Sequence, residues 1–153
     1  MKGKHLFALV GVIGLLYSCS VGIPPRILVT EVTPGKWGEW APADVWYENT
    51  DTLGRKKLDI LVRFRNDFAC DRFDVVLETL TPDSLVWRDT LSVPFEKKEF
   101  IEAVSLTYTD VKTPYRNPAQ LLRPGPYRFR FTPAPAALCV GEVIGVGIEI
   151  TQP

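Results

Sequence analysis

The residue whose surroundings most clearly predict a chemical modification is Cys19. It follows Leu16-Tyr17-Ser18 at the end of an apolar run over residues 6–16, and Lys2 and Lys4 precede that run. A basic start, a short apolar segment and a small residue before the cut are typical of a secretory signal. A Cys directly after this step predicts lipoprotein processing, in which the thiol takes a diacylglycerol and the chain is cut before Cys19. The alternative is an ordinary secretion signal with a chance Cys.

Lipid processing divides the chain into three parts. Residues 1–18 are the expected signal peptide, residues 19–26 a lipidated tether containing Gly22, Pro24 and Pro25, and residues 27–153 the folded domain. Two or three acyl chains hold a protein on a membrane far better than one. Ser20 stands where many bacteria use Asp to mark retention in the inner membrane. The expected location is therefore the cell envelope, on the periplasmic face of the outer membrane.

The residues needed for common kinds of catalysis are scarce in the mature chain. The single histidine, His5, lies in the signal peptide, which removes His-based nucleophilic catalysis and His-based metal sites. A phosphate-binding glycine loop is not present either, because Gly145 and Gly147 lie in a strand-like pattern. We therefore expect no enzyme activity, no cofactor and no metal site.

Paired carboxylates are the remaining catalytic possibility, because a glycosidase needs only two. Carboxylates this frequent usually form a solvated surface. The candidates are Glu39, Asp44, Glu48, Asp67, Asp71 and Asp74.

Two cysteines remain after Cys19 is assigned to the lipid. Cys70 and Cys139 can pair in an oxidising compartment, or they can be two buried thiols. Their spacing does not decide between these alternatives.

The charge balance excludes one class of partner. Without Lys2 and Lys4 the 18 basic residues become 16, against 18 acidic ones, a net charge of −2. A protein that binds nucleic acid through its backbone needs a basic excess, so we expect no nucleic-acid partner.

Three of the four tryptophans lie within residues 35–51, beside Tyr47. These side chains either fill a core or form an apolar platform for a ligand such as a sugar ring. Trp46 and Trp87 lie in strand-like runs, where we expect core positions. Trp37 and Trp40 flank Gly38 in a loop-like stretch, close in sequence to the tether. They are the predicted exposed platform for a partner or a glycan, at the membrane-proximal end.

The elements that must position these residues are strands. Apolar residues alternate with polar or small ones, which indicates strands with one buried face. The expected core faces are Leu58, Ile60, Val62 and Phe64; Phe73, Val75 and Leu77; Tyr127, Phe129 and Phe131; and Ile144, Val146, Ile148 and Ile150.

The segments between these runs are turn-like. Residues 49–54 and 81–84 read as turns, the second as a hairpin. Residues 117–122 predict one helical turn capped by Asn117, and residues 95–104 fit either a short helix or an irregular crossing. Thirteen prolines argue against long helices. The prediction is one all-β domain, an antiparallel, jelly-roll-like sandwich of about seven to nine strands.

Several short motifs follow one another along the mature chain. A Trp precedes an acidic residue and an aromatic strand at Trp40, Asp44 and Trp46. The stretch DILVRFRNDFACDRFDVVLE then carries Arg65, Asn66, Asp67 and Phe68. Further motifs are Asp89-Thr90-Leu91; Gly125, Tyr127 and Phe129; and Val146, Gly147, Ile148 and Ile150.

With these motifs the chain resembles a divergent member of the gliding motility lipoprotein family GldH. The resemblance implies a membrane lipoprotein that serves a cell-envelope machine of the gliding motility and type IX secretion kind. Two functions from different classes follow. The first is a non-enzymatic structural or interaction subunit, anchored in the membrane and bound to envelope proteins. The second is a lipid-anchored glycan-binding module that uses exposed Trp.

Overall fold

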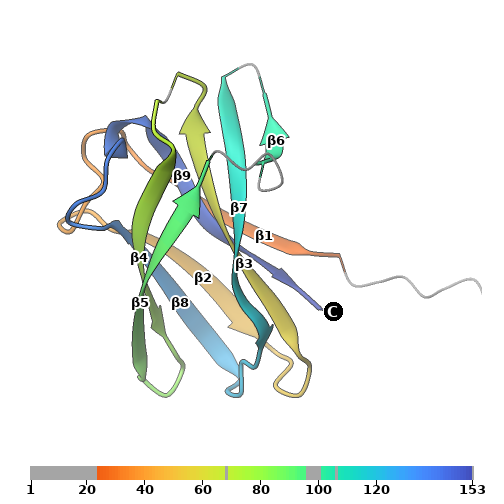
Figure 1. Cartoon of the computed structure of the whole chain (residues 1–153). Helices are drawn as coiled ribbons and strands as arrows, with labels where there is room; N and C mark the ends of the chain where they lie inside the picture. The colour runs from red at the N-terminus through yellow and green to blue at the C-terminus, as the bar shows by residue number, and fades with distance from the viewer. Residues whose placement is uncertain (1–23, 68, 96–100, 106, 153) are drawn as a thin grey trace, which may run out of the picture.

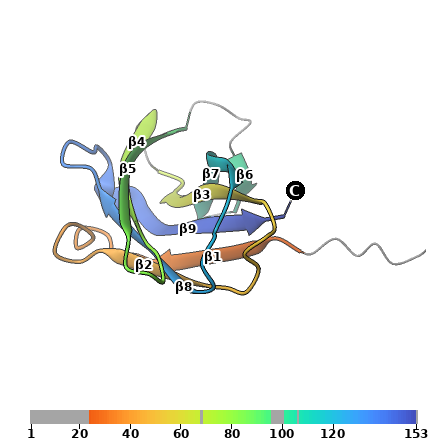
Figure 2. The same cartoon turned by 90° about the horizontal axis from the view of Figure 1, so that it is seen from below.

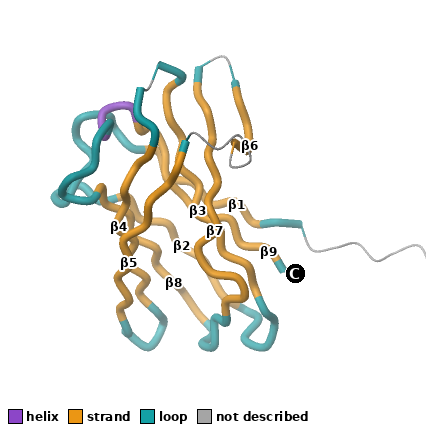
Figure 3. The backbone as a smooth tube through the Cα atoms, viewed as in Figure 1, coloured by secondary structure: helices purple, strands orange, loops and turns teal. Residues whose placement is uncertain are grey.

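The computed structural model of the chain describes residues 24–67, 69–95, 101–105 and 107–152. The predicted signal peptide, Cys19 with most of the tether, and Phe68 lie outside the described residues. Nine strands account for most of the described chain, and the helix among them is the three-residue 3-10 turn η2 (Figure 3). The elements are β1 (Arg26–Glu31), β2 (Ala43–Asn49), β3 (Lys56–Arg65), β4 (Arg72–Leu80), β5 (Val86–Pro94), β6 (Ile101–Val104), β7 (Tyr108–Ala119), β8 (Gly125–Pro133), η2 (Val140–Glu142) and β9 (Val143–Thr151).

The strands form two antiparallel sheets packed face to face (Figures 1 and 2). One sheet has the order β1-β9-β3-β7-β6 and the other β2-β8-β4-β5. Partners are nested along the chain, because β4 pairs with β5, β3 with β7, β2 with β8 and β1 with β9. Such nesting, with successive pairs in alternate sheets, is the topology of a jelly roll, here with β6 as an added edge strand. The predicted sandwich is confirmed.

The core lies between the sheets, and the alternating residues of the sequence supply it. The inward side chains of β3, β4 and β8 are all buried, as predicted, including Phe64, Phe73 and Phe129. The β9 face differs at one position. A register shift opposite Arg63 and Phe64 pairs Phe64 with Val143, so Val143 enters the core in place of Ile144.

The structure also tests the turn, the helical turn and the ambiguous segment that the sequence predicted between the strands. The hairpin at residues 81–84 is present and joins β4 to β5. The predicted helical turn at residues 117–122 is wrong, because β7 continues to Ala119, which pairs with Lys56 of β3. The Asn117–Pro118 peptide bond is cis. Part of the ambiguous segment 95–104 is strand β6, and residues 96–100 are outside the described chain.

The two ends of the sandwich carry different loops. Residues 24–26, 50–55, 81–85 and 120–124 lie at or beside one end, which we call the tether end. Residues 32–42, 66–67, 69–71 and 134–142 lie at the other, the far end. Because β1 runs from the tether end to the far end, the loop of residues 32–42, which contains both Trp37 and Trp40, follows β1 at the far end (Figure 1). The two tryptophans therefore lie at the opposite end of β1 from the residues that join the tether, although they are close to it in sequence.

Candidate functional site

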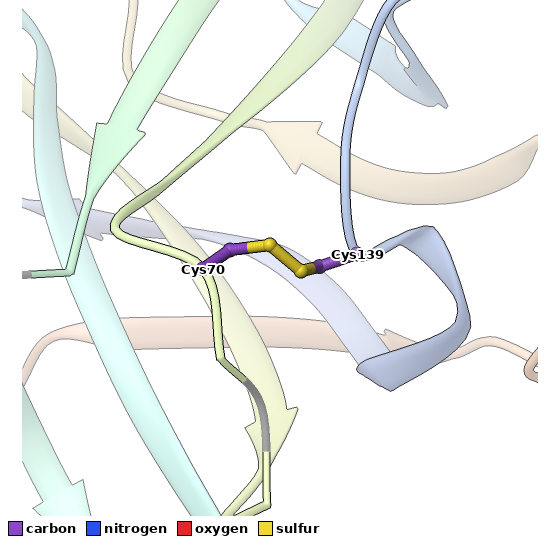
Figure 4. The surroundings of a disulfide bond; sticks show 2 residues. All are labelled: Cys70 and Cys139. Atoms are coloured by element: carbon purple, nitrogen blue, oxygen red, sulfur yellow. A yellow bond between two sulfur atoms is a disulfide. The ribbon is translucent and has the colours of Figure 1, made fainter.

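A disulfide joins Cys70 to Cys139, and this settles the alternative that the sequence left open (Figure 4). Their Cα atoms are 6.3 Å apart, within the usual range for a disulfide. Cys70 lies between β3 and β4, and Cys139 directly precedes η2. The bond ties together two loops of the far end.

Trp37 is a core residue, so its prediction as an exposed platform is wrong. Only 5% of its surface is exposed, and its ring stacks on Phe73 with centroids 5.7 Å apart. Its Nε1 donates a hydrogen bond to the carbonyl oxygen of Phe131 at 3.1 Å. A buried indole needs such a partner for its N–H. The loop of residues 32–42 thus folds its first Trp onto the end of the core.

Trp40 is exposed, as predicted, with 96% of its surface accessible. It belongs to a tight turn in which Gly38 and Ala41 exchange two backbone hydrogen bonds. Because Trp37 is buried beneath this loop, the two rings cannot form a shared platform.

Trp46 and Trp87 were expected in the core, and this expectation is wrong because both side chains are exposed. Trp46 is 57% and Trp87 41% accessible. Trp46 alternates with the buried Val45 and Tyr47 along β2, so it points away from the core. The alternation along β2 could have predicted this exposure, because Asp44 lies two residues before Trp46 and therefore points to the same face of the strand.

The first candidate site is a row of four residues across the outer face of the four-stranded sheet. Trp46 pairs with Arg128, Arg128 with Leu80, and Leu80 with Val86, one residue from each strand. We call these residues the Trp46 row. The guanidinium carbon of Arg128 lies 5.8 Å from the centroid of the Trp46 ring. The Nε of Arg128 is buried and has no hydrogen-bond partner within the described part of the chain.

The neighbouring row on the same face is made of charges that pair with one another. Its members are Asp44, Arg130, Glu78 and Arg88, again one from each strand. Arg130 donates two hydrogen bonds to Asp44, at 2.8 and 2.9 Å, and Arg88 lies 3.7 Å from Glu78. The hydrogen bonds from Arg130 hold the pKa of the Asp44 carboxyl below its ordinary value. These charges are already paired with one another, so the surface that they leave exposed beside them is the apolar and aromatic Trp46 row.

The second candidate site is a pocket on the open side of the sandwich, between β5 and the end of β7. Two adjoining hollows of about 120 and 260 Å³ share Trp87 and Gln120 in their walls. We call them together the Trp87 pocket. Its inner wall is apolar and includes Leu58, Leu121 and Phe129.

Polar groups converge at the mouth of the Trp87 pocket. The Tyr115 hydroxyl donates a hydrogen bond to Asp89, and Arg116 donates to the same carboxylate at 3.0 Å. The guanidinium carbon of Arg116 also lies 5.5 Å from the centroid of the Trp87 ring. Burial, together with the hydrogen bond to Asp89, raises the pKa of Tyr115 to about 12. Tyr115 therefore stays protonated at neutral pH and acts as a hydrogen-bond donor.

The carboxylates considered for catalysis are dispersed. Asp44, Asp67 and Asp74 each form an ion pair with an arginine of the same sheet or turn. No group of three or more His, Cys, Asp or Glu side chains with metal-binding geometry occurs among the residues the structure covers. An apolar pocket with a few polar groups suits binding.

No protein-family model, curated protein or solved structure matches the chain. Across the described ranges, no helix is long and apolar enough to span a membrane.

Proposed function

We propose that the chain is a lipid-anchored, non-enzymatic binding subunit of the cell envelope, and that the Trp46 row receives a protein partner. The anchor is Cys19, on the sequence pattern that precedes it. The resemblance to the GldH family supports a cell-envelope machine of the gliding motility and type IX secretion kind.

The observation that carries this proposal is the exposed Trp46 with Arg128 stacked upon it. Trp and Arg are enriched among the residues that dominate protein interfaces, and such residues cluster where water is excluded. A partner that covers the row would bury the indole. The half-buried Arg128 could also donate to a carbonyl or carboxylate of that partner.

The surroundings of the row also suit an interface. Four adjacent strands place its members across three strand spacings, about 14 Å in all. The paired charges of the next row form a polar border on one side. An apolar centre with a polar rim is the usual anatomy of a protein interface.

The proposal is tested by photo-cross-linking in cells that process the lipoprotein. A photoreactive amino acid replaces Val86, a member of the Trp46 row, and in a control it replaces Trp40 at the far end. We expect one envelope protein to cross-link from position 86, and not from position 40, and this product to disappear in Trp46→Ala. Cross-linking from position 86 that is unchanged in Trp46→Ala would contradict a partner held by the row.

The alternative is a lipid-anchored glycan-binding module, and the Trp87 pocket favours it. A sugar ring can stack on Trp87, and its hydroxyl groups can bond to planar polar side chains such as Gln120 and Arg116 at the mouth. Saturation-transfer NMR with envelope oligosaccharides tests this function. Transfer that is lost in Trp87→Ala and kept in Trp46→Ala would favour the glycan module. No transfer to any oligosaccharide would exclude it for the glycans tested.

A further inference from the structure

The tether joins the folded domain beside a particular set of loops. Pro24 and Arg26 line a hollow together with Thr50 and Asp51, which follow β2. The guanidinium carbon of Arg26 lies 5.9 Å from the ring centroid of Tyr47, near the end of β2. The chain therefore leaves the side of the sandwich next to the tether end (Figure 1).

Three loops at the tether end each present an exposed leucine. Leu53, between β2 and β3, is 91% accessible. Leu85, in the β4–β5 hairpin, is 54% accessible, and Leu122, between β7 and β8, is 63% accessible. We call these three residues the leucine rim. Figure 1 shows their loops side by side at one end of the two sheets.

Hydrogen bonds hold the first loop in the shape that exposes Leu53. The Asp51 carboxylate accepts the backbone N–H groups of Leu53 and Gly54 at 3.1 and 2.9 Å. The buried Lys56 side chain donates to the Asp51 carbonyl oxygen at 2.6 Å and lies 3.3 Å from its carboxylate. The loop is thus fixed and its acidic charge is neutralised.

The other two loops are fixed and joined to each other. The Thr81 hydroxyl accepts the N–H of Leu85 at 3.0 Å. Asn49 donates to the carbonyl oxygens of Leu121 and Arg123, at 2.8 and 2.9 Å, on either side of Leu122. Arg123 in turn pairs with Asp83 at 2.9 Å, which links the hairpin to the β7–β8 loop.

We infer that the leucine rim inserts into the surface of the lipid bilayer that holds the anchor. The inference rests on the proposed function, because it requires the lipid at Cys19. Seven Cα–Cα steps lead from Cys19 to Arg26, so the tether reaches at most about 25 Å. This keeps Arg26, and the 50–55 loop beside it, close to the bilayer. A domain turned with these loops toward the bilayer would bury its three exposed leucines there, and burial of apolar side chains is favourable.

Paired charges on the same loops suit this contact. The carboxylates of Asp51 and Asp83 are each matched by a cation, so they do not repel anionic lipid. With the rim in the bilayer, the far end with its disulfide points away from it. The Trp46 row lies on the outer face of a sheet at this same end, because Val86 directly follows Leu85, so a partner on the row would bind beside the bilayer surface.

The test uses the mature lipoprotein, with its acyl chains, in vesicles of phosphatidylethanolamine and phosphatidylglycerol. Single variants Leu53→Cys and Leu122→Cys are labelled with an environment-sensitive fluorophore without reduction of the native disulfide. Trp40→Cys, at the far end, is the matched control. We expect blue-shifted emission and protection from an aqueous quencher at positions 53 and 122, and neither effect at position 40.

Two failures are distinguishable by flotation of the vesicles. Protein that floats with the vesicles while all three labels stay equally accessible to the quencher overturns the leucine rim and leaves the lipid anchor in place. Protein that does not float overturns the anchor, and the rim with it.

Discussion

Arg128 of β8 lies over the exposed indole of Trp46 in β2, with its guanidinium carbon 5.8 Å from the ring centroid. The two residues are direct partners across the strands, so the sheet itself holds them together. A cation over an aromatic face fixes the indole on the surface without burying it. The pair therefore presents a large, ordered apolar surface to a partner at low cost in side-chain entropy.

The Trp37→Ala variant should unfold far more easily than the wild-type protein. The substitution removes a buried indole that stacks on Phe73 and donates to Phe131. Large-to-small changes of this kind cost about 3–5 kcal/mol. Chemical denaturation of the soluble domain measures the change. Trp40→Ala, in the same loop but exposed, should leave the free energy of unfolding nearly unchanged. Equal small effects of both substitutions would contradict the burial of Trp37.

The disulfide should make a large contribution to stability. Cys70 and Cys139 are 69 residues apart, and on the chain-entropy model a closed loop of that length contributes about 4 kcal/mol. The double variant Cys70→Ser/Cys139→Ser should lower the free energy of unfolding by an amount of that order. Thiol titration of the denatured, unreduced wild-type domain provides the direct check. Two reactive thiols there would contradict the bond.

Gly147→Ala should disturb the edge of the five-stranded sheet. A Cβ atom at this position would overlap the carbonyl oxygen of Leu28 and lie 2.8 Å from the Cα of Val29. Because both atoms are backbone, β1 must move, and overpacking of this kind costs about 1–3 kcal/mol. Hydrogen exchange should show lost protection in β1. Gly141→Ala is the control, because a Cβ there meets no atom within 4 Å. Unchanged exchange in β1 of the Gly147 variant would contradict this packing.

Alkaline pH should weaken the fold through Tyr115. Burial and the bond to Asp89 raise its pKa from 10.0 to about 12, so the folded state keeps this proton more tightly than the unfolded state. The resulting stability is fully present below pH 10 and is lost as the pH rises toward about 12. The free energy of unfolding should therefore fall more in the wild type than in Tyr115→Phe over this window. Parallel curves for the two proteins would contradict the raised pKa.

The alternation of side chains in the sequence predicted the strands and most of the core because both depend on local pattern. Trp46 was assigned wrongly because residue type was preferred over strand phase. Asp44, on the face of Trp46, shows that this face is solvated. The burial of Trp37 depends on Phe131, 94 residues away, which no local pattern records.

Long-range pairing also explains the other differences. The helical turn expected at residues 117–122 gave way to the pairing of Ala119 with Lys56. The Trp87 pocket depends on contacts between β5 and β7, such as Tyr115 with Asp89. Its residue types are ordinary in the sequence, and the fold alone brings them together.

The measurement that tests the central claim most directly is the affinity of the cross-linked envelope partner for three forms of the purified protein: wild type, Trp46→Ala and Trp40→Ala. An interface Trp of this kind contributes about 2 kcal/mol or more, which is about a thirtyfold change in Kd. We predict that Trp46→Ala weakens binding at least to this extent with an unchanged melting temperature, while Trp40→Ala binds like the wild type. Full affinity in Trp46→Ala would contradict the assignment of the Trp46 row as the partner-binding surface.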